Sequence, residues 1–84
     1  MIKVLFFAQV RELVACNELN LPCDYATAEA LRAALCERGD KWALALEAGK
    51  LLVAVNQTLA PLDTSINDGD EVAFFPAPPV TTGG

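Results

Sequence analysis

Apolar and polar positions in the first quarter of the chain predict two strands. Ile2 to Ala8 is rich in Ile, Val and Phe and predicts a strand that is apolar on both faces. Leu19 and Leu21 alternate with polar neighbours, which predicts a second strand over Glu18 to Leu21, paired with the first as a hairpin. The segment between them, Gln9 to Ala15, carries charge and is expected to form a loop or a short turn.

A helix is expected next. Its apolar positions recur at helical spacing and are Ala28, Leu31, Ala34 and Leu35. Thr27 suits the N-cap of this helix, and Gly39 is expected to end it. A second helical turn, capped by Asp40, is predicted around Trp42 to Leu46, but the pattern there is weaker than in the first helix.

The second half of the chain contains three apolar segments divided by turn signals. Asn56-Gln57 suits a tight turn, and Asp68-Gly69-Asp70 is a further turn in which the carboxylates bond their own backbone. The three expected strands are Leu51 to Val55, Thr58 to Leu62 and Glu71 to Phe75. Pro61 confines the middle one to an edge or a strand end.

A hairpin, a crossing helix and a return to the same sheet is the α+β arrangement called the β-grasp, as in ubiquitin. We therefore expect residues 1–75 to form a mixed sheet packed on one main helix. Residues 76–84 are expected to be a flexible, extended tail, because they combine three prolines with two terminal glycines. A ferredoxin-like fold is the alternative, but it needs a second full helix.

Strand alternation predicts which face of this sheet the helix covers. Lys3 and Glu71 mark the wetter face, because neither charge is expected to be buried unpaired. The helix should then cover Val4, Phe6, Val72 and Phe74. Phe7 and Phe75 are left on the outer face, where Leu59 could join them and Arg11 could add a charged contact at the rim. A loop folded over the two rings is the alternative.

Composition favours a protein that works with a protein partner. Apolar residues make up 54% of 84 residues, more than a small core can hide, yet no run reaches the ~18 residues that span a bilayer. The net charge of −5 argues against nucleic acid and anionic membrane surfaces. The N-terminus does not resemble a signal peptide, so we expect a cytoplasmic protein.

The side chains offer little chemistry of their own. There is no histidine, and Ser65 has no base in view, so a stand-alone enzyme is not expected. Cys16, Cys23 and Cys36 lack the spacing of a zinc site, and a disulfide is improbable in a cytosolic chain. Packing explains them best, and a persulfide on one of them is the alternative.

The C-terminal carboxylate of Gly84 is the remaining reactive group. It is ionised at pH 7 and can attack the α-phosphate of ATP to give an acyl-adenylate. A sulfur nucleophile can then displace AMP and leave a thiocarboxylate. Gly83 and Gly84 have no Cβ, so their role is also steric, since the tip must enter a narrow active site on another protein.

Several segments resemble the molybdopterin synthase small-subunit family of ubiquitin-like sulfur carriers. They are Met1 to Ala8 with Arg11-Glu12-Leu13, Ala54 to Gln57, Asp68 to Pro76, and the Pro-Pro-Val and Gly-Gly of the tail. The likeness runs from end to end and is weakest from Ala15 to Tyr25. The tail departs from the family pattern by Ala77 and a doubled Thr81-Thr82, which make it slightly longer.

The resemblance implies a function that depends on other proteins. An ATP-dependent activating enzyme would adenylate Gly84, and sulfur would be loaded there as a thiocarboxylate. The synthase large subunit would then take the tail, with Pro79 and Val80 in contact with it, and pass the sulfur to cyclic pyranopterin monophosphate to build the molybdopterin dithiolene. The family assembles as a heterotetramer, and ATP acts only through the activating enzyme, with no cofactor held by this chain.

Three alternatives share parts of this pattern. A sulfur carrier for thiamin thiazole synthesis uses the same Gly-Gly ending but is usually shorter and lacks the Pro-Pro-Val segment. A ubiquitin-like modifier would use Gly84 to form isopeptide bonds with lysines. An interaction module would use the domain alone, with no chemistry at its tail.

Overall fold

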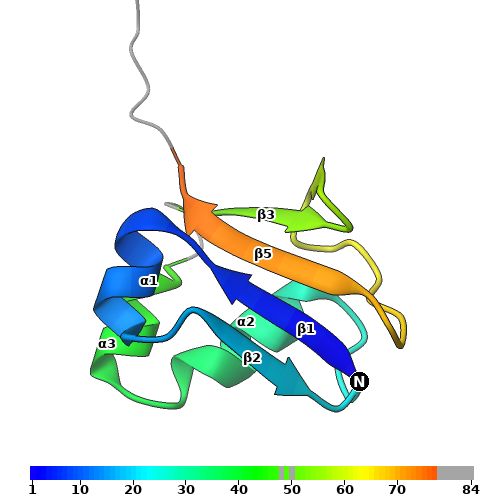
Figure 1. The fold of residues 1–84 in the computed structure, drawn as a ribbon, viewed down its shortest axis with the longest axis horizontal. Coiled ribbons are helices and arrows are strands. Elements are labelled where there is room, and N and C mark those ends of the chain that lie inside the picture. The colour runs from blue at the N-terminus through cyan, green and yellow to red at the C-terminus, as the bar shows by residue number, and fades with distance from the viewer. Residues whose placement is uncertain (48, 50, 78–84) are drawn as a thin grey trace, which may run out of the picture.

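A five-stranded mixed sheet forms the centre of the molecule (Figure 1). The computed structural model describes residues 1–47, 49 and 51–77. The strands are β1 (Ile2–Phe6), β2 (Glu18–Leu21), β3 (Leu51–Val55), β4 (Thr58–Ala60) and β5 (Glu71–Pro76). They lie in the order β2-β1-β5-β3-β4. The pair β1 and β5 is parallel, so both strands end at the same edge of the sheet, and the other pairs are antiparallel.

Three helices accompany the sheet in the described part of the chain: α1 (Ala8–Val14), α2 (Ala28–Cys36) and α3 (Asp40–Ala45). Helix α2 crosses behind the sheet, and α1 and α3 pack on each other near the end of β1 (Figure 1). This is the β-grasp arrangement expected from the sequence, so the ferredoxin-like alternative is wrong.

The core lies between the sheet and α2, and the strand alternation explains its composition. The inward-facing side chains of the two central strands are Ile2, Val4, Phe6, Val72 and Phe74, each with at most 1% of its surface exposed. Leu31 and Leu35 of α2 pack against them. The predicted N-cap is present, because the Thr27 hydroxyl accepts a hydrogen bond from the Ala30 amide at 3.2 Å.

Helix α1 is where the prediction of local structure was wrong, since a loop or short turn was expected over Gln9–Ala15. Val10 and Val14, one helical turn apart, are both buried and give the segment an apolar side. The strand before it ends at Phe6 rather than Ala8. Phe7 is the extended N-cap of α1, and Ala15 ends the helix in the left-handed conformation.

Other boundaries differ by a few residues. Helix α2 ends at Cys36, and Gly39 is instead the N-cap of α3, which makes Asp40 the first residue of that helix rather than its cap. Strand β4 stops at Ala60, before Pro61. Strand β5 continues through Pro76, which pairs with Leu51, so the extended segment expected from Pro76 onward follows this strand.

The acidic turn before β5 is structural, as expected. The Asp70 carboxylate accepts hydrogen bonds from the Asn67 amide and from Asn56 Nδ2, at 2.8 and 3.1 Å. Asp68 pairs with the N-terminal ammonium of Met1, and this contact holds the pKa of Asp68 below its usual range. Gly69 has φ of +90°, a conformation that glycine adopts without strain.

Candidate functional site

The face of the sheet opposite α2 carries a continuous set of apolar side chains, which we call the docking face. Its members are Leu5, Phe7, Leu52, Ala54, Leu59, Ala73 and Phe75. The strand register fixes this set, because Leu5 is opposite Ala73 across β1 and β5. Leu59 is opposite Ala54 across β4 and β3, which settles that Leu59 faces the same way as Phe75.

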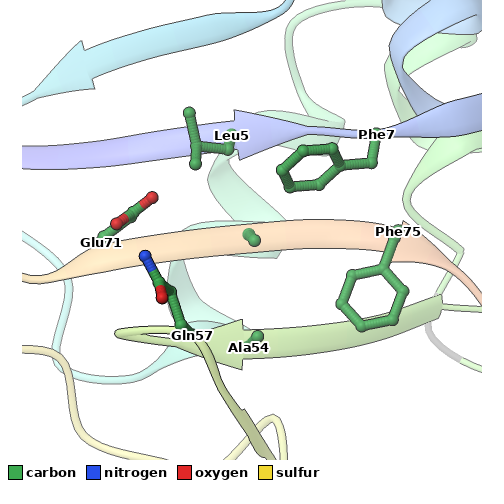
Figure 2. Close-up of a pocket in the computed structure, with 7 residues that line it drawn as sticks. Leu5, Phe7, Ala54, Gln57, Glu71 and Phe75 are labelled. Carbon is green, nitrogen blue, oxygen red and sulfur yellow. The ribbon is translucent and has the colours of Figure 1, made fainter.

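A shallow pocket of about 360 Å³ lies at the middle of the docking face. Figure 2 shows the rings of Phe7 and Phe75 at one end of it and the polar side chains of Gln57 and Glu71 at the other. Because β1 and β5 finish at the same edge of the sheet, the aromatic end is also the end from which the C-terminal tail departs.

Exposure confirms the predicted orientation of the aromatic residues. Phe7 keeps 45% of its surface exposed and Leu59 keeps 66%, while Phe75 is half-buried. Within the described part of the chain no loop folds over the rings, so the covered alternative is wrong. Large apolar side chains that stay exposed together on one sheet face are typical of a protein-binding surface.

Gln57 is a residue of the pocket that the sequence reasoning missed. It belongs to a two-residue turn in which Asn56 and Gln57 both have positive φ, 53° and 68°, the geometry of a tight hairpin. Two hydrogen bonds between Asn56 and Glu71 hold this turn against β5. The Asn56 side-chain oxygen accepts a hydrogen bond from the Glu71 backbone amide at 3.1 Å, and the Asn56 backbone amide donates one to the Glu71 carbonyl at 2.8 Å. This contact brings Gln57 to Glu71 at the polar end of the pocket.

The remaining predicted site residues are placed only in part. Arg11 is exposed on α1, one helical turn after Phe7, and does not line the pocket. Gly83, Gly84, Pro79 and Val80 lie outside the described residues. The part of the tail that is described starts directly from the docking face, because Phe75 lines the pocket and Pro76 follows it.

The cysteines occupy packing positions. Each is half-buried against the core, and each thiol lies near a backbone carbonyl: Cys16 near Glu18 at 3.3 Å, Cys23 near Ile66 at 3.9 Å and Cys36 near Leu46 at 3.8 Å. These contacts favour the structural interpretation over a persulfide. Among residues 1–47, 49 and 51–77, no three or more His, Cys, Asp or Glu side chains are grouped so that they could hold a metal ion.

None of the helices described has the length and apolar character needed to cross a bilayer.

The strand order and the exposed apolar face define the class of protein. The molecule is a β-grasp domain with an exposed apolar sheet face beside the start of a Gly-Gly tail, the class of ubiquitin-like proteins. More narrowly, the chain belongs to the ThiS family, whose model matches residues 4–84.

Curated relatives match over the whole chain. The molybdopterin synthase sulfur carrier subunits of Haemophilus influenzae and Escherichia coli are each 61% identical to it over 83 residues, which cover 99% of this chain and all of theirs.

Solved structures of differently named proteins agree with the fold. Subunits 1 and 2 of the molybdopterin-converting factor from Helicobacter pylori were solved as a complex, and the matching chain is 26% identical with a TM-score of 0.62, covering 98% of this chain and 97% of that one. The crystal structure of SAMP1 from Haloferax volcanii matches at 26% identity and a TM-score of 0.66, with 98% of both chains covered. A second crystal structure from that organism, described as small archaeal modifier protein 1, is 25% identical with a TM-score of 0.64, covering 94% of this chain and 97% of that one.

Proposed function

We propose that this chain is the sulfur carrier subunit of a molybdopterin synthase. The observation that carries the proposal is the full-length match, at 61% identity, to two sulfur carrier subunits of that enzyme. The apolar docking face and the Gly83-Gly84 ending supply the two parts that such a carrier needs, a surface for its partners and a reactive tip.

The chemistry takes place at the carboxylate of Gly84. One of its oxygens attacks the α-phosphorus of ATP on an activating enzyme, and pyrophosphate leaves. Hydrosulfide, or a sulfur donor at the same oxidation level, attacks the acyl carbon of the resulting adenylate, and AMP leaves with the bonding electron pair. The product is a C-terminal thiocarboxylate. Its sulfur forms a C–S bond with cyclic pyranopterin monophosphate in the large subunit, and water then cleaves the acyl C–S bond, which restores the carboxylate of Gly84. ATP acts only in the first step, and this chain holds no cofactor of its own.

The docking face serves the partners in turn. Its apolar area lies beside the start of the tail, so a protein that binds there has the tip of the chain within reach of its own active site. The complex of subunits 1 and 2 in the Helicobacter pylori relative supports a large subunit as one partner. An activating enzyme is the other, and a cytoplasmic heterotetramer with two large subunits is the assembly we propose.

Removing Gly84 tests this proposal, as does adding one residue after it. Either change should abolish sulfur transfer in a synthase assay reconstituted with the activating enzyme and the large subunit, because the thiocarboxylate cannot form in the right place. A variant with Cys16, Cys23 and Cys36 all changed to Ser is the control and should keep activity if it folds. Normal activity after removal of Gly84 would contradict the proposal.

A ubiquitin-like modifier is the second candidate function, and the matches to small archaeal modifier protein 1 favour it. Adenylation of Gly84 is the first step in both cases, so the domain alone does not separate them. Isopeptide conjugates to lysines of other proteins, found in cells and lost on removal of Gly84, would favour the modifier. Their absence together with a thiocarboxylate favours the carrier.

A further inference from the structure

A second hollow, lined by apolar and polar side chains, lies beside Pro76. This side groove, about 270 Å³ in volume, runs between α1 and α3. Its apolar lining is Val10, Leu13, Leu44, Ala45 and Pro76, and Gln9 and Glu47 also line it. Leu44 keeps 63% of its surface exposed, which places it with Phe7 and Leu59 among the most exposed large apolar side chains described. Leu44 is not among the described side chains that pack in or against the core, so its side chain is available to a partner.

The start of the tail separates the side groove from the docking face. Phe75 lines the pocket of the docking face, and Pro76, the next residue of β5, lines the side groove. A protein that surrounds the tail at this point therefore contacts both surfaces. The seven residues from position 78 to Gly84 span at most about 25 Å when fully extended. A partner whose active site lies inside its own surface must come close to Pro76 to reach the tip.

The size of the docking face also indicates a second contact. Strands are about 4.8 Å apart and residues about 3.3 Å apart along each strand. Across β1, β5, β3 and β4, and over about four residues of each, the apolar area has a flat footprint on the order of 200 Å². A stable interface buries about 800 Å² on each partner. The apolar docking face alone falls short of this area, so a lasting complex also draws on the surfaces that adjoin it. These are the inserted tail and, beside the start of the tail, the side groove.

We propose that the side groove is a second docking site, which receives an apolar side chain of the synthase large subunit once the tail is inserted. The inference rests on the proposed function, because it needs that partner. The large subunit is the occupant rather than the activating enzyme, since it holds the carrier as a subunit and so needs the larger interface. The chain's own tail is a poorer occupant, because the Pro78-Pro79 sequence disfavours the reversal that would return Val80 to the groove.

Leu44→Glu in the full chain tests the proposal, because it places a charge in the groove at an exposed position that should not affect folding. Calorimetric titration with the recombinant large subunit should show a Kd that is raised about tenfold or more. Ala33→Glu, which adds the same charge at an exposed position of α2, should leave the Kd unchanged. The rate at which the activating enzyme adenylates Leu44→Glu should also stay unchanged.

The outcomes separate this inference from the proposed function. An unchanged Kd for Leu44→Glu, with tight binding by the unsubstituted chain, would overturn the side groove alone. Failure of the unsubstituted chain to bind the large subunit would overturn both. A similar loss in adenylation would overturn the assignment to the large subunit. With a photoreactive benzoylphenylalanine at position 44, illumination of the complex should give a cross-link to the large subunit, and a cross-link to the chain's own tail or to a second copy would overturn it.

Discussion

Two neighbouring phenylalanines in β5 have opposite surroundings. Phe74 has none of its surface exposed and stacks on Phe6 in the core, with ring centroids 6.3 Å apart. Phe75 points to the other face of the sheet, is half-buried, and lines the pocket of the docking face. The same contrast holds for Phe6, which is buried, and Phe7, which is exposed.

The contrast shows how a small chain divides its apolar residues between folding and binding. Strand alternation sends every second side chain of β1 and β5 to the core and the rest to the outer face. The core set stabilises the domain without a partner. The outer set stays in water until a partner covers it, so its free energy of burial is available for binding. Substitutions on the two faces should therefore affect different measurements.

Phe74→Ala should have the largest effect on stability. Truncation of a fully buried phenylalanine costs about 3–5 kcal/mol, a large part of the ~5–15 kcal/mol that stabilises a typical domain. Urea denaturation followed by circular dichroism should show a midpoint far below that of the unsubstituted chain. A midpoint equal to that of Phe75→Ala would contradict the claim that the buried face stabilises the domain more than the outer face does.

Phe75→Ala should act on binding instead. Loss of a central aromatic anchor costs an interface about 2 kcal/mol or more, so the Kd for the large subunit should rise at least about tenfold. The free energy of unfolding should change much less than in Phe74→Ala, because Phe75 lies on the outer face. Calorimetry measures the first quantity and urea denaturation the second. Unchanged affinity, or a variant that unfolds, would show that Phe75 belongs to the core.

Much of this division was predictable from the sequence. The strands and α2 follow from local alternation and spacing, and the facing of Phe7 and Phe75 follows from the charges of Lys3 and Glu71 in the same strands. Helix α1 was missed because its two buried residues, Val10 and Val14, occupy barely two turns, and its N-cap, Phe7, offers no side-chain hydrogen bond.

The unpredicted parts of the site depend on contacts between distant segments. Gln57 reaches the pocket through the turn geometry fixed by Asn56 and Glu71, which lie 15 residues apart. The side groove exists because α1 packs on α3 and Pro76 continues β5 beside them. Periodicity along the chain reports which face a side chain occupies within one element, but not how two short helices pack.

Glu29→Gln should have the smallest effect on the free energy of unfolding. Glu29 lies on α2, the helix that covers the buried face of the sheet. Arg32 is paired with the Glu29 carboxylate and holds its pKa below the usual value, while the same guanidinium donates to the Leu46 carbonyl at 2.9 Å. A carboxyl whose pKa is lowered in the folded state stabilises it above the unfolded pKa of about 4.3, and this contribution is lost as pH falls through the folded value.

The substitution should therefore lower the free energy of unfolding at pH 7 by about 0.3–0.5 kcal/mol, the usual range for an ion pair between side chains one helical turn apart. The gap between the two proteins should close as the pH drops below about 4. Urea denaturation at several pH values measures this, with Glu12→Gln on α1 as the control for loss of charge. A gap that stays constant at low pH would mean that the pair does not act through the carboxylate charge.

The central claim is that the chain carries sulfur on Gly84, and the mass of the intact protein from cells tests it most directly. Fragmentation should place on Gly84 a mass increase equal to the exchange of one oxygen for one sulfur. A chain with an unmodified C-terminus, from cells in which molybdopterin is being made and under conditions that preserve thiocarboxylates, would contradict the account, as would sulfur found only on a cysteine.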